Sequence, residues 1–487
     1  MMGIRKPNML LLVGTFLMAT FTGAQNGGFT NAADFGFSPE ASGVDNVAAL
    51  QKAVDQTGTI IVAKPGVYKV AGTTYIGSNT TLEFGNGVII QKMDEKGLFA
   101  HVLLNKGALT KTYDEHIAVK GLHISVNGVV KRMSDVFGLR GQLAFFYVKD
   151  LRIDGFRSYD IEGVQYSIHI CTFEDVIIDN AVLKGDKDGI HFGKGKRFTV
   201  SNSVFQTQDD ALALNAHDYS TGNPEIGWIE DGLVENCYDM AAPEQKTLGY
   251  FCRILAGGWK DWEQGMKVQN GDAVVTNDRI YRVDGLTEKG KPDEKVYTSS
   301  TAPSHEKGMQ EIDGIKWVMI QEGTHHTAGV KNVTFRNVFL EKPRIGFSIH
   351  FDQNWWSRSY YPGAEVPVQK QLLFDNIRVL HRERAPILRV NTPVDAFSIT
   401  NSSFGNSGIR VDAKKDVLSD YFPTKINITN SVFNAEGEMV LLDNQVPGKV
   451  IHFKTANNIE VSDDFSAKVI EGRGTVKVES DLTGLKK

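Results

Sequence analysis

The chain lacks the features that mark most cofactor-dependent enzymes. It has only three cysteines among 487 residues, Cys171, Cys237 and Cys252, so no disulfide framework is implied. We expect buried free thiols, with a bridge between Cys237 and Cys252 as the alternative. The sequence contains no glycine-rich dinucleotide or phosphate-binding fingerprint and no Ser-His-Asp arrangement. His325-His326 has no further ligands at metal spacing, so we predict no zinc site, no other metal and no cofactor.

The chain also lacks a large excess of charge of either sign. Lysine and arginine number 53 and aspartate and glutamate 58, which leaves a net charge of −5. This balance argues against a nucleic-acid partner and does not favour a strongly anionic polymer.

Only the N-terminus contains a long apolar run. Arg5 and Lys6 precede it, residues 9–21 form it, and Thr22-Gly23-Ala24 offers small residues to a signal peptidase. The run is too short for a membrane span, and no cysteine follows it as a lipid attachment site. We predict a signal peptide over residues 1–24, a secreted or periplasmic location, and no membrane span after cleavage.

A short apolar motif recurs along the rest of the chain. Each copy is a strand-like run with a central Asn or Gly followed by a further apolar pair, as in VIIDNAVL, FTVSNSVF, VTFRNVF, LLFDNIRV, FSITNSSF and INITNSVF. The central residues fall at positions 121, 155, 180, 202, 236, 337, 376, 401 and 430. Most steps are 22 to 39 residues, too short for a strand with a crossover helix or for a propeller blade.

Repeats of this length, rich in β-branched and aromatic residues, are typical of a solenoid of parallel strands. We predict an all-β chain folded as a right-handed parallel β-helix, with the Asn residues stacked as a ladder inside the turns. A β-sandwich is the alternative, but it would not repeat one motif at coil spacing. We expect the folded chain to be a monomer.

The segment from Asp34 to Val70 predicts an N-terminal cap. Asp45 is the expected N-cap of a helix over residues 46–56, with Val47, Leu50 and Val54 on one face. Such a helix would cover the open strand edge and apolar core at the end of a solenoid.

Two acidic clusters lie one repeat apart. They are DKDGI, which contains Asp188, and QDDALALN, which contains Asp209 and Asp210; Asp188 and Asp209 are 21 residues apart. Since neighbouring parallel strands lie ~4.8 Å apart, the three carboxylates are expected to converge in one solvent-open cleft. Crowded carboxylates raise at least one pKa, as a general acid beside a general base requires.

These motifs resemble the polygalacturonase-type glycoside hydrolases of family 28. The cap matches their Asp-Phe-Gly start, Leu-Gln-x-Ala helix and Pro-Gly-x-Tyr turn, Asp188 matches the Asp of their NTD motif, and Asp209-Asp210 matches QDD one coil later. The resemblance covers roughly residues 34–256. It implies a right-handed β-helix and hydrolysis with inversion, in which Asp209 protonates the glycosidic oxygen while Asp188 and Asp210 activate water.

The chain departs from the family pattern at three places. Asp186 and Lys187 replace the Asn and Thr of NTD. The GHG motif has two possible counterparts, Asp231-Gly232 and Gly249-Tyr250, neither with histidine. Of RIK only Arg253 remains as a cation. In the family that Arg-Lys pair holds a uronate carboxylate, so we expect a neutral, branched or modified sugar at least as much as galacturonan.

The step of 101 residues from Asn236 to Asn337 predicts an insert in the solenoid. We place it at residues 262–323, between β-helix halves over residues 25–261 and 324–487. Its Gly-Asp-Ala-Val, Ala-Pro-Ser-His and Asp-Gly-Ile-Lys-Trp motifs resemble the small β modules related to chitin-binding domains of families 5 and 12. Trp262, Tyr281 and Trp317 either stack on sugar faces or form the core of the insert.

A second irregular segment, residues 349–367, predicts a long aromatic loop. Its exposed aromatic residues would be costly without a use, so we expect them to bind sugar; a lid that buries its own aromatics is the alternative. His169 and His191, on neighbouring coils, are expected either to line the cleft or to be structural. The candidate substrate-binding residues are Arg253, His169, His191, Asp352, Trp355, Trp356, Arg358 and Tyr360.

Together these patterns predict an exported glycoside hydrolase that cleaves a polysaccharide or oligosaccharide. One alternative is a lyase on a uronate polymer, in which the carboxylates bind calcium and Lys187 or Arg253 is the base. The other is a carbohydrate-binding β-helix without catalysis.

Overall fold

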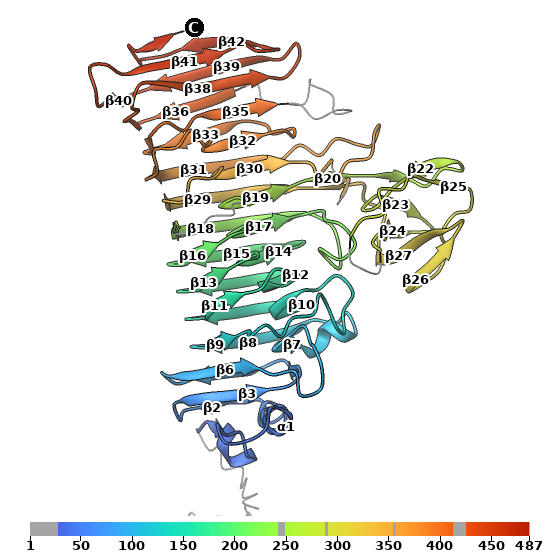
Figure 1. The fold of residues 1–487 in the computed structure, drawn as a ribbon. Coiled ribbons are helices and arrows are strands. Elements are labelled where there is room, and N and C mark those ends of the chain that lie inside the picture. Colours follow the sequence, from blue (N-terminus) through green and yellow to red (C-terminus); the bar gives the residue numbers. More distant parts are fainter. Residues whose placement is uncertain (1–27, 242–248, 288–290, 354–356, 413–424, 487) are drawn as a thin grey trace, which may run out of the picture.

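Parallel strands stack coil upon coil into one long column in the computed structural model (Figure 1). It describes residues 28–241, 249–287, 291–353, 357–412 and 425–486. Within them, 34 strands form a single parallel sheet system, which confirms the right-handed parallel β-helix. The predicted signal peptide lies outside the described residues. In the part of the chain described, no helix is long and apolar enough to cross a bilayer.

The strands of the column fall into two groups, separated by the insert. Before the insert they are β1 (Thr30–Asn31), β2 (Gly58–Val62), β3 (Gly66–Val70), β4 (Thr74–Ile76), β5 (Thr80–Phe84), β6 (Val88–Lys92), β7 (Leu103–Asn105), β8 (Asp114–Lys120), β9 (His123–Ser125), β10 (Gly141–Asp154), β11 (Arg157–Ile161), β12 (Tyr166–Asp179), β13 (Val182–Gly185), β14 (Ile190–Phe192), β15 (Gly195–Ser201), β16 (Val204–Thr207), β17 (Leu212–Asn215), β18 (Ile229–Asp239) and β19 (Cys252–Leu255). After it they are β29 (Val330–Leu340), β30 (Phe347–His350), β31 (Lys370–Val379), β32 (Leu388–Val390), β33 (Phe397–Thr400), β34 (Ser403–Phe404), β35 (Ile409–Asp412), β36 (Lys425–Thr429), β37 (Val432–Phe433), β38 (Glu438–Gln445), β39 (Val450–Ala456), β40 (Ile459–Glu460), β41 (Ser466–Ile470), β42 (Thr475–Glu479) and β43 (Leu485–Lys486).

Equivalent residues of successive coils pair directly, and this register builds the core. In one column Ile168, Ile190, Leu212, Cys252 and Phe347 follow one another, and all are fully buried. Period-two alternation sends these side chains inward and their neighbours outward. All three cysteines are buried and free, so the expectation of unpaired thiols is confirmed.

The repeated Asn marks a corner at which the backbone turns left-handed. Asn180, Asn202, Asn236 and Asn337 have φ of 54°, 51°, 55° and 53°, and Gly121 stands at the equivalent position with φ of 66°. Asn and Gly tolerate this conformation best, which explains the motif. The ladder does exist, since Asn337 Nδ2 donates to Asn236 Oδ1 at 3.0 Å. The prediction that it lies inside the turns is wrong, because these side chains lie on the outer surface.

The helix α1 (Gly43–Val54) caps the N-terminal end of the column. Its N-cap is Ser42, whose hydroxyl accepts from the backbone N–H of Asp45 at 3.1 Å, so the prediction of Asp45 as N-cap is wrong. Asp45 lies instead in the first turn, where a carboxylate favours the positive end of the helix dipole. Leu50 and Val54 are buried against the first coils, as expected.

A small β unit leaves the column after β19 and projects from its side (Figure 1). It contains a five-stranded sheet of β21 (Lys260–Asp261), β23 (Ala273–Thr276), β24 (Arg279–Val283), β27 (Ile315–Glu322) and β26 (Gly308–Ile312), the last four paired antiparallel. Two pairs of short strands accompany it, namely β20 (Gly257–Gly258) with β28 (Thr327–Ala328) and β22 (Met266–Val268) with β25 (Tyr297–Ser299). Tyr281 and Trp317 are fully buried in its own core, as the structural alternative for these aromatics expects.

Candidate active site

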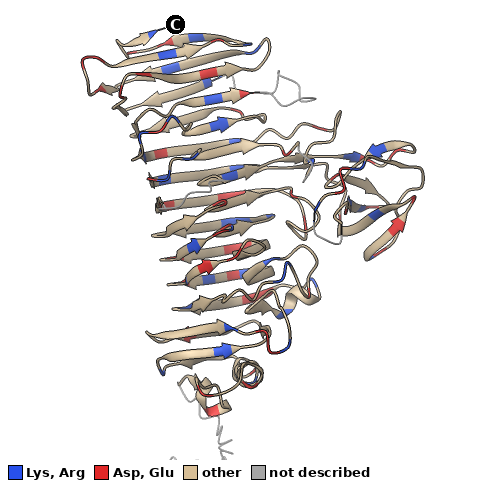
Figure 2. Ribbon diagram, in the orientation of Figure 1, with Lys and Arg blue, Asp and Glu red and all other residues tan. Residues whose placement is uncertain are grey.

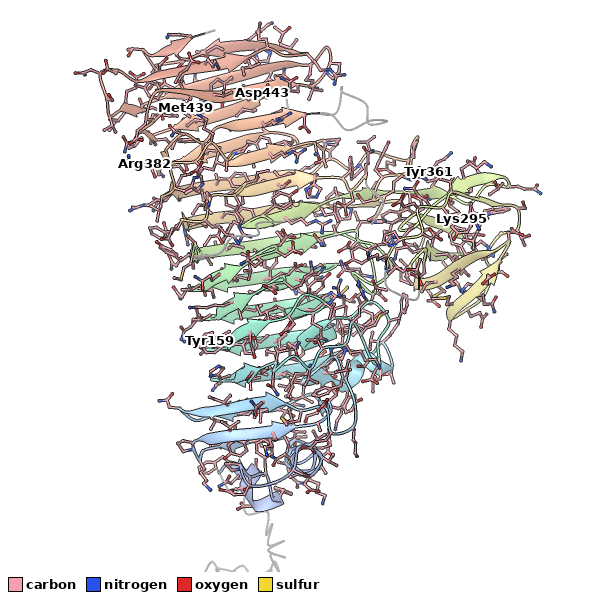
Figure 3. All side chains as sticks on the ribbon, in the orientation of Figure 1. Tyr159, Lys295, Tyr361, Arg382, Met439 and Asp443 are labelled. Carbon is pink, nitrogen blue, oxygen red and sulfur yellow. The ribbon has the colours of Figure 1, made fainter. Side chains whose placement is uncertain are left out.

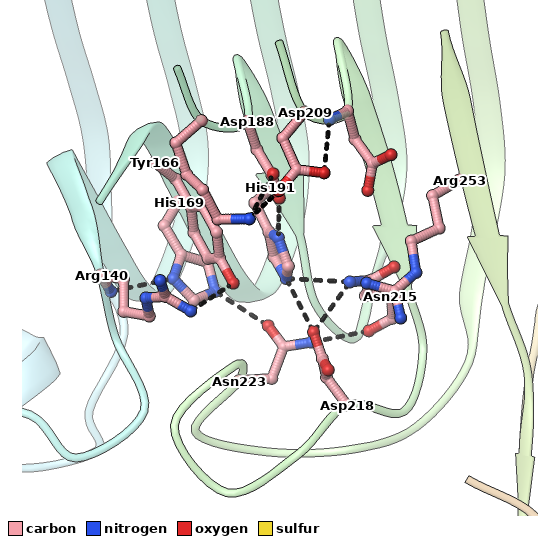
Figure 4. Close-up of polar contacts among 12 residues, drawn as sticks. Arg140, Tyr166, His169, Asp188, His191, Asp209, Asn215, Asp218, Asn223 and Arg253 are labelled. Atoms are coloured by element: carbon pink, nitrogen blue, oxygen red, sulfur yellow. Dashed lines mark hydrogen bonds and ion pairs between the residues drawn. The ribbon is translucent and has the colours of Figure 1, made fainter. Parts of the chain in front are cut away.

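The structure brings Asp188, Asp209 and Asp210 together at the entry to β14 and β17. Figure 4 shows Asp188 and Asp209 at this place. One oxygen of each carboxylate lies within 4.8 Å of the others. The backbone sets this geometry, because Gly189 N–H donates to the carbonyl of Asp210 at 3.0 Å and so aligns the two turns. Asp188 and Asp210 are 2% and 3% exposed, whereas the side chain of Asp209 is 23% exposed. Asp209 is therefore the member that a ligand reaches first.

The ammonium group of Lys187 lies inside this cluster. It contacts Asp209 Oδ2 and lies 3.4 Å from Asp188 Oδ1. Burial alone would lower the pKa of Lys187, but the charges of Asp188 and Asp209 outweigh burial and raise it above its ordinary value. Lys187 therefore stays protonated and places a fixed positive charge beside both carboxylates.

Asp210 has the opposite electrostatic environment. Burial, and then the charges of Asp209 and Asp188, raise its pKa well above the ordinary value. Its Oδ1 accepts from Tyr250 N–H at 2.9 Å, and its own N–H donates to Asp209 Oδ1 at 3.1 Å. Asp210 is therefore the carboxyl group of the cluster that retains a proton.

Two buried histidines lie behind the acids and are both neutral, since burial lowers their pKa values well below the ordinary value. His191 Nδ1 lies 3.1 Å from Asp188 Oδ2, and its ring stacks on Tyr166 at 4.1 Å. His169 Nδ1 accepts from Arg140 N–H at 3.0 Å, and its Nε2 lies 2.8 Å from Asn223 Oδ1. Both histidines are fully buried, as the structural alternative for them expects. His191 orients Asp188, and the ring of His169 packs against that of His191.

The loop after β17 connects these histidines to the insert. Asp218 and Asn223 of this loop lie next to His191 and His169, with Asp218 Oδ2 3.7 Å from His191 Nε2. Arg282 of β24 is fully buried and donates to the carbonyls of Asp218, Ser220 and Asn223 at 3.0, 3.1 and 2.5 Å. Burial lowers the pKa of Arg282 to about 10, so it remains charged at neutral pH. The insert thereby anchors the loop that supports the site.

Arg253 lies in β19, one coil beyond the acids. It pairs in register with Ala213 of β17, and both side chains point away from the core of the column. Its Nη2 lies 2.5 Å from Asp352 Oδ2; Asp352 is buried, and the side chain of Arg253 is 17% exposed. Burial alone would raise the pKa of Asp352, but the charge of Arg253 outweighs burial and lowers it. The one cation retained from the RIK motif is thus already matched by a carboxylate.

The aromatic loop after β30 turns toward the insert. Arg358 Nε donates to Asp272 Oδ1 at 2.8 Å, which ties the loop to the insert. Tyr360 is 2% exposed and donates its hydroxyl to Ala364 O at 2.9 Å, and Tyr361 packs against the core of the insert (Figure 3). Trp355 and Trp356 lie outside the described residues. Sugar binding by this loop remains a prediction, and the described part of it is packed as a lid.

The structure separates the two possible counterparts of the GHG motif. Gly249-Tyr250 lies at the acids, where a Cβ on Gly249 would approach Asp209 C to 2.4 Å, so no side chain fits there. Asp231 lies in β18 around the corner, where it accepts from Asn332 Nδ2 at 2.7 Å. Sequence reasoning missed the contributions of Tyr250, Asn223 and Arg282, because none carries a local motif.

The three carboxylates are also the group of described residues best placed to hold a cation. Lys187 already supplies a positive charge to two of them. The predicted absence of a metal and of a cofactor remains a prediction.

Comparisons with known proteins show the fold. No family model matches the sequence, and no curated protein matches it. Among solved structures, the catalytic unit of a family 87 alpha-1,3-glucanase from Streptomyces thermodiastaticus is similar with a TM-score of 0.55 at 14% identity, over 95% of this chain and 69% of that chain. A family 28 exopolygalacturonase from Yersinia enterocolitica matches with a TM-score of 0.46 at 13% identity, over 93% and 79% of the two chains. An endo-xylogalacturonan hydrolase from Aspergillus tubingensis matches with 0.43 at 10%, over 94% and 100%. The first of these structures, with a TM-score above 0.5, shows that the chain shares its fold. The resemblance of the insert to chitin-binding modules is not confirmed.

Proposed function

We propose that the protein is an exported glycoside hydrolase, and the observation that carries this proposal is the electrostatic asymmetry of the acid cluster. Hydrolysis of a glycosidic bond needs one carboxylic acid and one carboxylate close together. Asp210 retains a proton, while Asp188 and Asp209 face the ammonium group of Lys187. The cluster thus combines one carboxyl group that keeps its proton with two that lie beside a fixed cation.

The roles within the cluster follow from exposure and charge. Asp209 is the exposed member, so it is the group that reaches the glycosidic oxygen, in keeping with its assignment as acid. The proton that it delivers is stored on Asp210, one of whose carboxyl oxygens lies within 4.8 Å of an oxygen of Asp209. Binding of substrate would displace Lys187 from Asp209 and allow the proton to move between these neighbouring carboxyl groups. Asp188, oriented by His191, then acts as the base toward water.

The stereochemistry is proposed as inversion. Acid and base of inverting enzymes lie ~6.5–9.5 Å apart to leave room for the water. The nearest oxygens of this cluster lie within 4.8 Å, so the side chains must rotate apart when substrate and water enter. Proton NMR of the first product anomer tests this step, and retention would contradict it.

For the substrate we propose a neutral or modified sugar linkage. Arg253 is paired with Asp352, so its guanidinium is not left to bind a uronate carboxylate. The lyase alternative is weaker, because the raised pKa of Lys187 opposes its use as a base. A lyase would produce an unsaturated uronide that absorbs in the near ultraviolet, whereas a hydrolase would not.

The test is a screen of plant, algal and host glycans for reducing-end release, followed by variants on the glycan that is cleaved. Asp209→Asn keeps the shape but removes the titrating group, so cleavage should fall by ~10²-fold or more. Asp231→Asn, on another face, is the control and should cleave normally. Cleavage at nearly the parent rate by the Asn variants at 188, 209 and 210 would contradict the mechanism. Binding without cleavage by the parent would favour the binding-only alternative.

The predictions of export and of a monomeric state belong to the same proposal. The N-terminal residue of the protein recovered from the culture medium or periplasm would identify the cleavage site. Light scattering on that material would give the mass in solution.

A further inference from the structure

A ladder of alternating charges runs along the outer surface at the corner between the site-bearing strands and the next sheet. Register pairs Lys149 with Glu174, Glu174 with Lys196, Lys196 with Glu230, and Glu230 with Lys331. Two of these contacts are ion pairs, Lys196–Glu174 at 3.6 Å and Lys331–Glu230 at 3.1 Å. Opposite charges on neighbouring strands stabilise a sheet, so this part of the ladder has a structural role.

The alternation of positive and negative side chains is broken at one pair of neighbouring strands. Lys331 pairs in register with Lys370 of the following coil, so two ammonium groups stand on adjacent strands. Like charges placed directly opposite one another destabilise a sheet. Within the described residues Lys370 has no ion-pair partner, and nearby Asp395 accepts from the backbone N–H of Ala396 at 2.7 Å. Since Lys331 is ion-paired with Glu230, Lys370 is the cation at this corner that has no ion-pair partner among the described residues.

An aromatic platform and two hollows lie at the same place. Trp228, half-buried on Gly329, lines a cavity of about 330 Å³ with Tyr113 and Lys194, and another of about 290 Å³ with Lys331 and Lys370. The first extends to His325 and the second to Thr327, so the returning segment of the insert borders both. Lys331 Nζ lies 5.6 Å from the Trp228 ring. We call this feature, with Trp228 at its centre and Lys331 and Lys370 on one side, the Trp228 groove.

We propose that the Trp228 groove is an accessory binding site for a glycan segment that carries anionic sugars. The apolar face of a pyranose ring suits an indole platform, and lysines bind carboxylate or sulfate groups. Solenoid coils lie ~4.8 Å apart, a spacing similar to that of sugars along a chain, so successive rings can meet Trp228 and the lysine pair. The groove faces a different corner from the acid cluster, because Trp228 precedes β18 whereas the acids precede β14 and β17. Binding there does not depend on the hydrolytic proposal.

The test is calorimetric titration of the full chain, carrying Asp209→Asn to prevent turnover, with three tetrasaccharides. Tetragalacturonate and a sulfated cellotetraose carry the anionic groups, and cellotetraose is the neutral control. We expect at least one of the two anionic probes to bind. Binding of tetragalacturonate identifies carboxylate as a recognised group, and binding of sulfated cellotetraose identifies sulfate. Trp228→Ala and Lys370→Glu should each weaken that binding by about tenfold or more, as loss of a stacking platform or a charge-assisted contact does.

The Lys370→Glu variant can also be tested by its thermal stability, which should change in the opposite direction to its binding. It restores the alternation with Lys331, so its melting temperature should rise while binding is lost. Lys425→Glu, on exposed β36, makes the same change in net charge and should leave binding unaltered. The proposal is overturned if cellotetraose binds as tightly as the anionic probes, if neither anionic probe binds, or if Lys425→Glu weakens binding as much as Lys370→Glu.

Discussion

The ammonium group of Lys187 contacts the carboxylate of Asp209, which the next coil contributes. This pairing connects the residue that most clearly departs from the family motif to the residue expected to donate the proton. It also places a fixed cation inside the cluster of three acids, beside Asp188 and Asp209, whereas Asp210 keeps its proton.

Lys187→Met should shift the pH dependence of hydrolysis. Lys187 contacts Asp209 and lies 3.4 Å from Asp188 Oδ1, so loss of this cation disfavours an ionised base in the cluster, which is then lost at a higher pH than in the parent. We expect the acidic limb of the kcat/KM profile to move upward by about one unit, which corresponds to roughly 1.4 kcal/mol. Lys184→Met, one strand away on the outer surface, is the matched control and should leave the profile in place. An unchanged acidic limb would contradict the electrostatic role of Lys187, and complete loss at all pH values would favour the lyase alternative.

Asp210→Asn should stabilise the protein at neutral pH. The folded pKa of Asp210 is raised above its ordinary value of 3.8, so the folded state binds the proton more tightly than the unfolded state. Asp210 therefore lowers stability progressively as pH rises above about 3.8 toward its folded pKa. Thermal unfolding between pH 4 and 8 should show a smaller decline for Asp210→Asn than for the parent. An equal decline in both would show that Asp210 is ionised in the folded state.

Arg282→Met should affect the active site although Arg282 lies in the insert. Three buried carbonyls of the loop after β17 would lose their donor, at a cost of about 1–3 kcal/mol in the free energy of unfolding. Since that loop holds Asn223 and Asp218 against the histidines, kcat should fall more than KM changes. Arg279→Met, on the same strand but paired with exposed Glu306, is the control. Normal kcat in Arg282→Met with normal stability would show that the loop supports itself.

At position 337 we expect the Gly variant, Asn337→Gly, to be more stable than the Ala variant, Asn337→Ala, the reverse of the usual order in a strand. Both lose the hydrogen bonds of the outer ladder, but only Ala must adopt a left-handed φ of 53° with a Cβ. We expect the Ala variant to unfold at lower urea than the Gly variant, by about 1 kcal/mol. At Thr199, inside β15, the order should be the usual one, with Gly less stable than Ala. The same order at both positions would contradict the backbone explanation of the repeated Asn.

Much of the fold and the centre of the site could be predicted from the sequence. The repeat defines the coil, and a separation of 21 residues brings Asp188 and Asp209 onto neighbouring coils. The same local patterns were less reliable for the N-cap of α1 and for the direction in which the corner Asn side chains point. Ser42 rather than Asp45 caps α1, because two polar residues three positions apart can both serve as N-cap and only the path of the backbone decides. The corner Asn residues face outward because their common requirement is a left-handed φ rather than a buried amide.

Partners that are distant in the sequence could not be predicted. Arg358 and Tyr360 were expected to touch sugar, yet Arg358 pairs with Asp272 and Tyr360 is buried in its own loop. Arg253 was expected to bind substrate, and it pairs with a carboxylate 99 residues further along the chain. The sequence around each of these residues contains no pattern that predicts such a distant partner.

The sequence by itself determined what repeats: the solenoid, the outward and inward alternation, the corner residues and the coil-by-coil convergence of three carboxylates. A repeat can be read locally because each coil contacts mainly its neighbours. Only the tertiary structure decided the protonation of the cluster, since burial of Asp210 and the position of Lys187 depend on how coils, loop and insert pack together. The same holds for the contact between Arg282 and the loop after β17, which joins two segments that are about sixty residues apart in the chain.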